Sequence, residues 1–489
     1  MPMAALSPIP LRGAARPVRA RLLLAWFACA LLVACADPGP QQPSIAATEP
    51  AALGLSDAAT ALVAQDWWTA FGDPALERQM AQALRGHPSL ELARARLARA
   101  QALAEQHAAA YEWQASVRAD VTVQRYSANG ITPAPIAGST RDISNLMLGA
   151  SLPLGTFERQ AADLAAALGL VRAAQADAAA ATTLLAAQVG RGYITLARLV
   201  AQQDLARRVL HQRRQVAALA SERVLAGLDN RIDVTQADAA VADTHGQIEA
   251  LDEQIALARR LLAAWSGQAP QELDGLRPML AQLTLEAMPL VVGADLLARR
   301  PDVVAARWRV EAAAQDVQLA RTRFYPDINL SAFAGLNALG IGKLLRAGSL
   351  QAGIMPALHL PLFDGGPLRA QLKTRQAELD AAIAQYNAAV LDAAREAGDA
   401  IASERSLQRQ VAEQQRALAG TEATLALATR RQAAGLVNYL VVLQAQSPVL
   451  AQLRLVTELR ARQLDNRIVL MQALGGGWKA DPLVAAPLQ

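Results

Sequence analysis

The chain has few aromatic residues, few histidines and almost no cysteine. Aromatics make up 4% of its 489 residues, and there are five histidines and two cysteines. The histidines stand far apart, with no pair at metal-ligand spacing, so the sequence predicts no metal site, no cofactor and no enzyme. The few bulky residues leave little material for ordinary globular cores. A hydrophobic content of 53%, much of it alanine, favours slender, closely packed helices.

The mature chain also lacks a net charge. The first 34 residues hold four arginines and no acidic residue. Without these four of the 47 basic residues, 43 remain against 43 acidic residues. A nucleic-acid footprint needs a concentrated basic face, so we expect no nucleic-acid partner.

The N-terminal segment has the pattern of a bacterial secretion signal. An arginine-rich stretch is followed by the apolar run 22–34, which is too short to span a bilayer as a helix. The run ends in Leu-Val-Ala before Cys35, and this resembles a lipobox, so Cys35 is the predicted lipid anchor to the outer membrane. An ordinary signal peptide that happens to contain Cys35 and Cys29 is the alternative.

Two long helical patterns and two pairs of alternating strands follow along the chain. Apolar periodicity predicts helices over 76–113, 156–226, 231–265, 294–323, 368–434 and 439–473, and the segment 156–226 contains no proline. A helix over 156–226 would be about 105 Å long. Period-two alternation predicts strands at 115–123, 145–154, 328–334 and 352–362, with Pro356 accommodated by a local bulge.

A twelve-residue helix-turn-helix tip occurs twice, at 226–237 and 434–445. Gly, Leu, Asn, Val, Gln and Ala coincide at one offset, so the chain is read as a duplication in which each copy is the bend of a helical hairpin. The shorter segments 231–265 and 294–323, laid end to end, would nearly equal one long helix in length, and so would 439–473 and 76–113. Pro448 is expected to kink or loosen the second return helix.

The four strands predict an oligomer. Strands of ten or eleven residues with one apolar face suit an outer membrane, where lipid cannot satisfy an open sheet edge. Four strands cannot close a barrel, so the barrel must be shared between chains, with three copies giving twelve strands and a lumen. A soluble four-stranded sheet in a periplasmic protein is the alternative.

Seven stretches of the mature chain match one family in the right order. They are Cys35 in its lipobox, 68–74, 300–303, 324–326, 361–366, 435–440 and 473–478. The chain resembles the outer-membrane channel subunits of tripartite RND-type efflux systems, the TolC-like family, and specifically its NodT-type lipoprotein branch. The resemblance implies a mainly α fold with a small β part. It also implies a homotrimer with a shared twelve-stranded β-barrel and a periplasmic α-helical tunnel.

The resemblance further implies docking with a periplasmic adaptor, or membrane fusion protein, and an inner-membrane RND-type transporter. It implies a passive exit duct that partner contacts open at the hairpin tips. The candidate gate residues are Gly227, Leu228, Asp229, Arg231, Asp233, Gly435, Leu436, Val437, Tyr439 and Gln444.

The second tip departs from the family's pattern. Where relatives commonly carry an acidic residue, this chain has Val437, Val441 and Gln444, and its nearest carboxylates follow the first tip. Two alternatives for the constriction therefore stand at this point: a ring of acidic residues, or an apolar constriction formed by Leu436, Val437 and Tyr439.

The predicted organisation is a duplicated chain behind a processed leader. The segments are a signal peptide 1–34, a lipid-anchored tether 35–75, a first repeat 76–270, a connector 271–293, a second repeat 294–474 and a tail 475–489. The main rival is a periplasmic coiled-coil adaptor, which usually has one hairpin and no paired membrane-length strands. A diffusion porin is disfavoured because it has no place for long helices.

Overall fold

The structure is a computed structural model that describes residues 43–48, 63–155, 157–284, 293, 299–361 and 364–479. The described chain divides into two compact units. One contains the strands and comprises residues 109–163 and 315–377, and the other is helical and comprises the described parts of 44–108, 164–314 and 378–489. Each unit therefore draws on both halves of the sequence.

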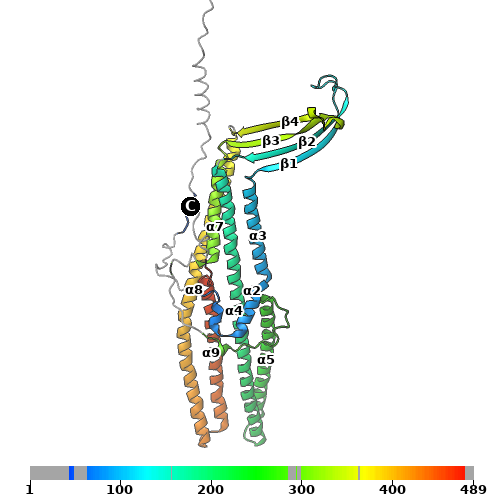
Figure 1. The fold of residues 1–489 in the computed structure, drawn as a ribbon. Helices are drawn as coiled ribbons and strands as arrows, with labels where there is room; N and C mark the ends of the chain where they lie inside the picture. The colour runs from blue at the N-terminus through cyan, green and yellow to red at the C-terminus, as the bar shows by residue number, and fades with distance from the viewer. Residues whose placement is uncertain are drawn as a thin grey trace, which may run out of the picture. The chain divides into compact units, whose positions relative to one another are not determined.

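The four predicted strands form one antiparallel sheet in the order β1-β2-β3-β4. The strands are β1 (Gln114–Arg125), β2 (Thr140–Pro153), β3 (Asp327–Leu339) and β4 (Leu350–His359) (Figure 1). The register aligns Val117, Leu148, Ala334 and Ala352 in one row across the four strands. Because side chains alternate between faces, this face of the sheet is mainly apolar, with its polar residues gathered near the loop between β1 and β2.

The opposite face of the sheet is mixed, with a polar row among apolar residues such as Met147 and Phe333. Asn145 Nδ2 donates to Asp120 Oδ2 over 2.9 Å, and Asn337 Nδ2 donates to Asn145 Oδ1 over 2.5 Å. Arg118 lies 3.3 Å from Asp120 Oδ1 on the same face. This two-faced sheet is what the alternation predicted.

The predicted bulge at Pro356 is wrong. Pro356 pairs with Leu330 in a register that runs without interruption from Asp327 to Leu336. The strand β4 lies at an edge of the chain's own sheet, where a missing N–H is tolerated. It ends at His359, earlier than predicted, just before Pro361.

The helices come in pairs of equal length. Both α4 (Phe157–Leu225) and α8 (Gly365–Ala433) have 69 residues, and both α5 (Arg231–Trp265) and α9 (Tyr439–Ala473) have 35. A third pair, α3 (Pro88–Ala109) and α7 (Pro301–Thr322), has 22 residues each. The equal lengths agree with a duplicated sequence, whose repeat boundaries stay a prediction.

The first predicted helix is broken in two. Instead of one helix over 76–113, the structure has α2 (Pro74–Gly86) and α3, with His87 between them at φ −66° and ψ 136°. Proline disfavours helical geometry in the residue before it and lacks the N–H that would continue the ladder, so Pro88 ends one helix and begins the next. Apolar periodicity alone did not reveal this break.

The two shorter helices pack at successive positions along α4. A Cβ on Gly169 would lie 3.1 Å from Cβ of Ala312 in α7, and one on Gly192 would lie 2.7 Å from the Trp265 ring at the end of α5. Such close approach needs small residues, as the alanine-rich composition predicted. Within the helical unit, the end-to-end arrangement of short helices is thus supported by their contacts.

The aromatic stretch before α2 anchors the chain to α4. Trp67 and Phe71, in the short helix η2 (Trp67–Phe71), are 3% and 2% exposed and belong to the largest core cluster. Asp73 caps α2 by accepting from the N–H of Ala75, and its other oxygen accepts from the buried Tyr193 hydroxyl over 2.5 Å. Burial and this carboxylate together raise the pKa of Tyr193 far above its usual range.

Candidate functional site

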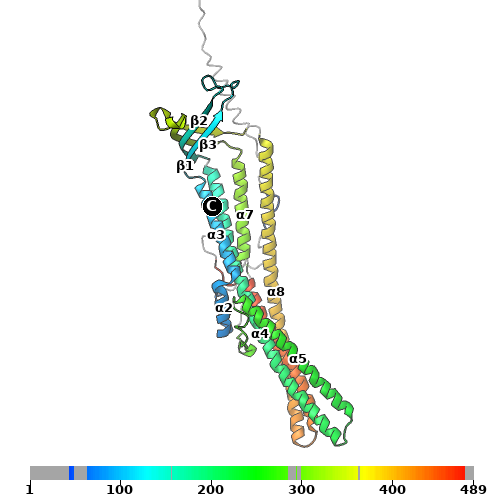
Figure 2. The same cartoon turned by 90° about the vertical axis from the view of Figure 1, so that its right-hand side faces the viewer.

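Both helical turns lie at the same end of the helical unit (Figures 1 and 2). Each is a left-handed glycine turn, because Gly227 and Gly435 both have φ 69°. In the first, Gly227 N donates to Val224 O and Leu228 N donates to Arg223 O. In the second, the N–H groups of residues 435 and 436 donate to the same two relative positions of α8. This paired pattern closes a helix end and reverses the chain.

An asparagine starts the return helix in each copy. Asn230 accepts from Ile232 N over 2.8 Å, and Asn438 accepts from Val441 N over 3.3 Å. A side-chain oxygen at this position satisfies an otherwise orphan N–H of the first turn. The coincidence of Gly and Asn in the two sequences therefore has a direct geometric cause.

The first tip is closed by a charged pair. Arg223 Nε and Nη2 donate to the two oxygens of Asp229 over 2.5 and 3.1 Å, which is a bidentate contact across the turn. The hydrogen bonds from Arg223 hold the pKa of Asp229 below its ordinary value. Of the predicted gate carboxylates, Asp229 is thus committed to its own turn, while Asp233 and Arg231 are exposed on α5.

The second tip carries no charge. The sequence from Gln432 to Leu453 contains no Asp, Glu, Lys or Arg. Leu436 is 69% exposed and Tyr439 44% exposed, while Val437 is half-buried. The end of this hairpin is therefore an apolar projection in the described chain.

A buried amide links the first hairpin to the return helix of the second. Gln212 of α4 is 3% exposed, and its Nε2 donates to Leu443 O over 2.6 Å and to Ser447 Oγ over 3.2 Å. The helix α9 continues through Pro448, which has no N–H to give to the carbonyl four residues before it. Gln212 thus supports α9 in the turn where its own ladder is weakened.

Two hollows lie between α4, α5 and α9 beside this link. The smaller has a volume of about 210 Å³ and is lined by Gln444 together with Gln212, Arg213 and Ala237. The larger, of about 1000 Å³, holds Arg198 with Nη1 3.2 Å from Glu458 Oε2. Gln444 is therefore the predicted gate residue that lies against the other hairpin.

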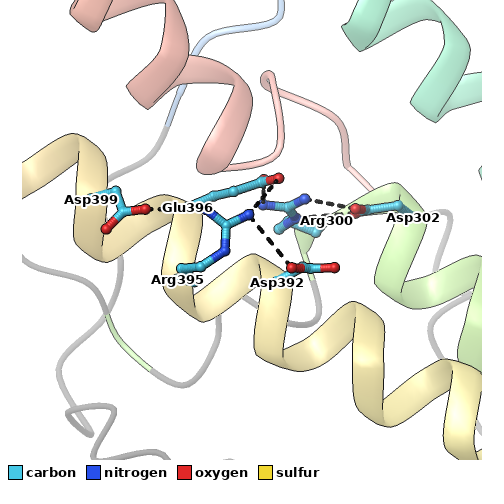
Figure 3. A network of polar contacts seen from close by, with 6 residues as sticks. All are labelled: Arg300, Asp302, Asp392, Arg395, Glu396 and Asp399. Carbon is cyan, nitrogen blue, oxygen red and sulfur yellow. Dashed lines mark hydrogen bonds and ion pairs between the residues drawn. The ribbon is translucent and has the colours of Figure 1, made fainter.

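A buried arginine fixes the start of α7 against α8 (Figure 3). Arg300 is 7% exposed, and it donates to both oxygens of Asp302 over 3.1 and 2.6 Å and to Glu396 Oε2 over 2.7 Å. Burial lowers the pKa of Arg300, but its hydrogen bonds to the two carboxylates outweigh burial and raise it overall. Pro301 starts the helix with Asp302 in its first turn, later than the predicted start at 294, and the Arg-Pro-Asp sequence has this structural role.

The predicted and observed site residues differ in two respects. Cys35 lies outside the described residues. Arg223 and Gln212 were not predicted. Arg223 could have been found from its position six residues before Asp229 across a glycine turn, whereas Gln212 has no sequence signal.

The comparison with protein families decides the identity. The model of the family described as "Outer membrane efflux protein" matches residues 80–268 and 292–476. The chain belongs to this family. Both matched stretches contain a complete helical hairpin, so the family includes both tips.

Three relatives extend the match over most of the chain. This efflux protein is 37% identical over 368 residues to the fusaric acid resistance protein FusA of Burkholderia cepacia, covering 72% of this chain and 68% of FusA. It is 32% identical over 438 residues to the multidrug resistance outer membrane protein MdtP of Escherichia coli K12, covering 86% and 87%. The solved structure of the outer membrane protein VceC from Vibrio cholerae is similar with a TM-score of 0.78 and 33% identity, covering 86% and 100%.

The family fixes the function at a coarse level. The protein is an outer-membrane efflux channel with a periplasmic helical domain, and not an enzyme. The interpretation as a coiled-coil adaptor is therefore wrong, as the two hairpins and four strands also indicate. Assignment to the NodT-type branch stays a prediction.

Proposed function

We propose that three copies of the efflux protein form one exit duct, with a shared twelve-stranded barrel in the outer membrane. The observation that carries this proposal is the four-stranded sheet with one mainly apolar face and free edges at β1 and β4. Lipid cannot satisfy the backbone groups of a free edge, and four strands are too few to close a barrel. Pairing of β4 with β1 of the next copy removes every edge.

Each chain is anchored to the outer membrane through an acylated Cys35. Pro43, where the described chain begins, is eight positions after Cys35, so the connection can extend at most about 29 Å. The segment beyond Pro43 is fixed to α8, since Ser44 N and Thr48 N donate to Asp380 and Asn387 over 2.9 and 2.8 Å. These contacts support a short tether between the lipid and the helical unit.

The periplasmic gate is the apolar second tip. Leu436, Val437 and Tyr439 of three chains form the constriction, and the first tip, held by Arg223 and Asp229, forms its outer support. Gly227 and Gly435 form the turns, Leu228, Arg231 and Asp233 are exposed at the first tip, and Gln444 lies at the junction between hairpins. Contacts with a periplasmic adaptor and an inner-membrane RND-type transporter favour the open state over the closed one, which is a population shift.

The cargo belongs to the classes that the relatives' names indicate. FusA is named for fusaric acid resistance and MdtP for multidrug resistance. A constriction of Leu436, Val437 and Tyr439 suits such organic compounds better than free metal ions, because these side chains carry no charge and their one side-chain oxygen is the Tyr439 hydroxyl.

A cysteine at the second tip tests the gate. The mature chain has no cysteine besides the acylated one, so Leu436→Cys introduces a unique free thiol. Oxidation is expected to link tips of neighbouring chains, give a covalent dimer on a non-reducing gel, and abolish efflux until a reductant is added. Leu228→Cys is the matched control, since Leu228 is 66% exposed on the first tip and Leu436 69% on the second. Equal cross-linking and equal loss of efflux in both variants would exclude the second tip as the specific gate.

A further inference from the structure

The sheet has two loops that join strand to strand. Residues 126–139 join β1 to β2, and residues 340–349 join β3 to β4, whereas the other ends of the strands continue into helices (Figure 1). In an outer-membrane channel with periplasmic helices, the two loops lie at the outer leaflet.

The charge at this end is strongly one-sided. The stretches 124–142 and 337–350 contain Arg125, Arg141, Lys343 and Arg346, but only one acidic residue, Asp142. All four basic side chains are exposed, and none has an ion-pair partner among the described residues. Asp142 is occupied, because its carboxylate accepts from Ile341 N over 2.5 Å and its carbonyl accepts from Gly340 N over 2.7 Å.

The loop 340–349 is a tight structure that projects apolar side chains. Lys343 N donates to Gly340 O over 2.9 Å, and Ser349 Oγ donates to Lys343 O over 2.8 Å. Ile341 and Leu345 are nevertheless 62% and 84% exposed, four residues apart and beside the two basic residues of the loop. Exposed apolar residues interleaved with basic ones are typical of segments that lie in a membrane interface.

We propose that the loop 340–349, together with Arg125, binds the phosphate-bearing glycolipid of the outer leaflet. Lys343 and Arg346 contact the phosphates, and Ile341 and Leu345 enter the acyl region beneath them. Arg125 is in phase with Val121 and Val123, so it lies on the apolar face of the sheet, where a long basic side chain reaches up to the headgroups. A lipid is favoured over a soluble anion because Ile341 and Leu345 are exposed apolar side chains, which would contribute nothing to binding a small anion.

Arg141 provides an internal control. It pairs in register with Gln124 and so lies on the opposite face, away from the predicted lipid contact. Its Nε donates to Ser139 Oγ over 3.2 Å, and its side chain is exposed like those of the loop. Removing its charge changes the net charge of this end by the same amount as removing Lys343.

The test measures lipid binding by the full-length, acylated protein in detergent, using native mass spectrometry. The probes are lipid A with two phosphates and lipid A with its phosphates removed. The double variant Lys343→Gln and Arg346→Gln is expected to bind diphosphorylated lipid A about 25-fold more weakly, since each basic residue near an anionic surface contributes about five-fold. Leu345→Ser is expected to weaken binding of both lipids, and Arg141→Gln to leave binding unchanged.

Three outcomes would overturn the proposal. The first is an unchanged affinity of the double variant for diphosphorylated lipid A. An unchanged melting temperature would show that this variant is correctly folded. The second is an equal loss of affinity in Arg141→Gln, which would reduce the effect to net charge. The third is displacement of the lipid by millimolar inorganic phosphate in the unmodified protein, which would indicate a site for a soluble anion. None of these readouts depends on the tip gate, so the gate proposal stands or falls separately.

Discussion

Replacing Gln212 is expected to loosen the closed tips. The change Gln212→Met keeps the length and shape of the side chain but removes both hydrogen bonds to α9, those to Leu443 O and Ser447 Oγ. These bonds join the first hairpin to the return helix of the second within five residues of Pro448. If opening separates the hairpins, their loss favours the open state.

The size of the effect follows from burial. A buried hydrogen bond contributes about 0.5–1.5 kcal/mol, so the two bonds of Gln212, which is 3% exposed, stabilise the closed arrangement by about 1–3 kcal/mol. Because about 1.4 kcal/mol corresponds to a factor of ten, the ratio of closed to open states should fall roughly 5- to 150-fold.

Single-channel recording of the reconstituted protein measures this ratio directly. The control is Gln247→Met, because Gln247 Nε2 donates to Asp243 of its own helix α5 and, among the described residues, Gln247 makes no hydrogen bond to another helix. We expect a raised open probability in Gln212→Met and an unchanged open probability in Gln247→Met. An open probability in Gln212→Met equal to that of the control, in a protein that is still folded, would refute the role of this link in gating.

Two further predictions concern packing and pH. Gly192→Ala should lower the free energy of unfolding by about 1–3 kcal/mol, because its Cβ would lie 2.7 Å from the Trp265 ring. Gly246→Ala, with no atom within 4 Å of its new Cβ, should not destabilise, and equal melting temperatures of the two variants would contradict the close packing. The first tip should be insensitive to pH between 8 and 5. Arg223 lowers the pKa of Asp229 in the folded state. The ion pair therefore stabilises the folded tip fully at any pH above the pKa of Asp229 in the unfolded chain, and this stabilisation is lost only as the pH falls through the lowered pKa of the folded state. An open probability that rises from pH 8 to 5, and no longer does so in Asp229→Asn, would contradict this.

The sequence predicted the elements of the fold because their signals are local and long. Residues 231–265 and 439–473 were predicted to be helices and are helices with those bounds. Apolar periodicity, glycine turns and period-two alternation each act within a few residues of the chain, so no tertiary contact was needed to recognise them. The break at His87 was missed because it depends on a single proline within an otherwise continuous apolar period.

The candidate site was only partly accessible to the sequence. The glycines and asparagines of both tips could be predicted, because a left-handed turn and a helix cap need those residue types. Gln212 could not be predicted, since its partners are more than 230 residues away and exposed glutamines on α4 look the same in sequence. The same holds for Arg300, whose contact with Glu396 depends on how α7 packs on α8.

The most direct test of the shared barrel is the mass of the mature protein in detergent, measured by light scattering alongside the intact mass of the chain. The account predicts an assembly of three chains, each beginning at Cys35 and heavier than its sequence by the attached acyl groups. A monomer without lipid would contradict it, because four strands alone cannot close a barrel and no anchor would hold the chain to the membrane.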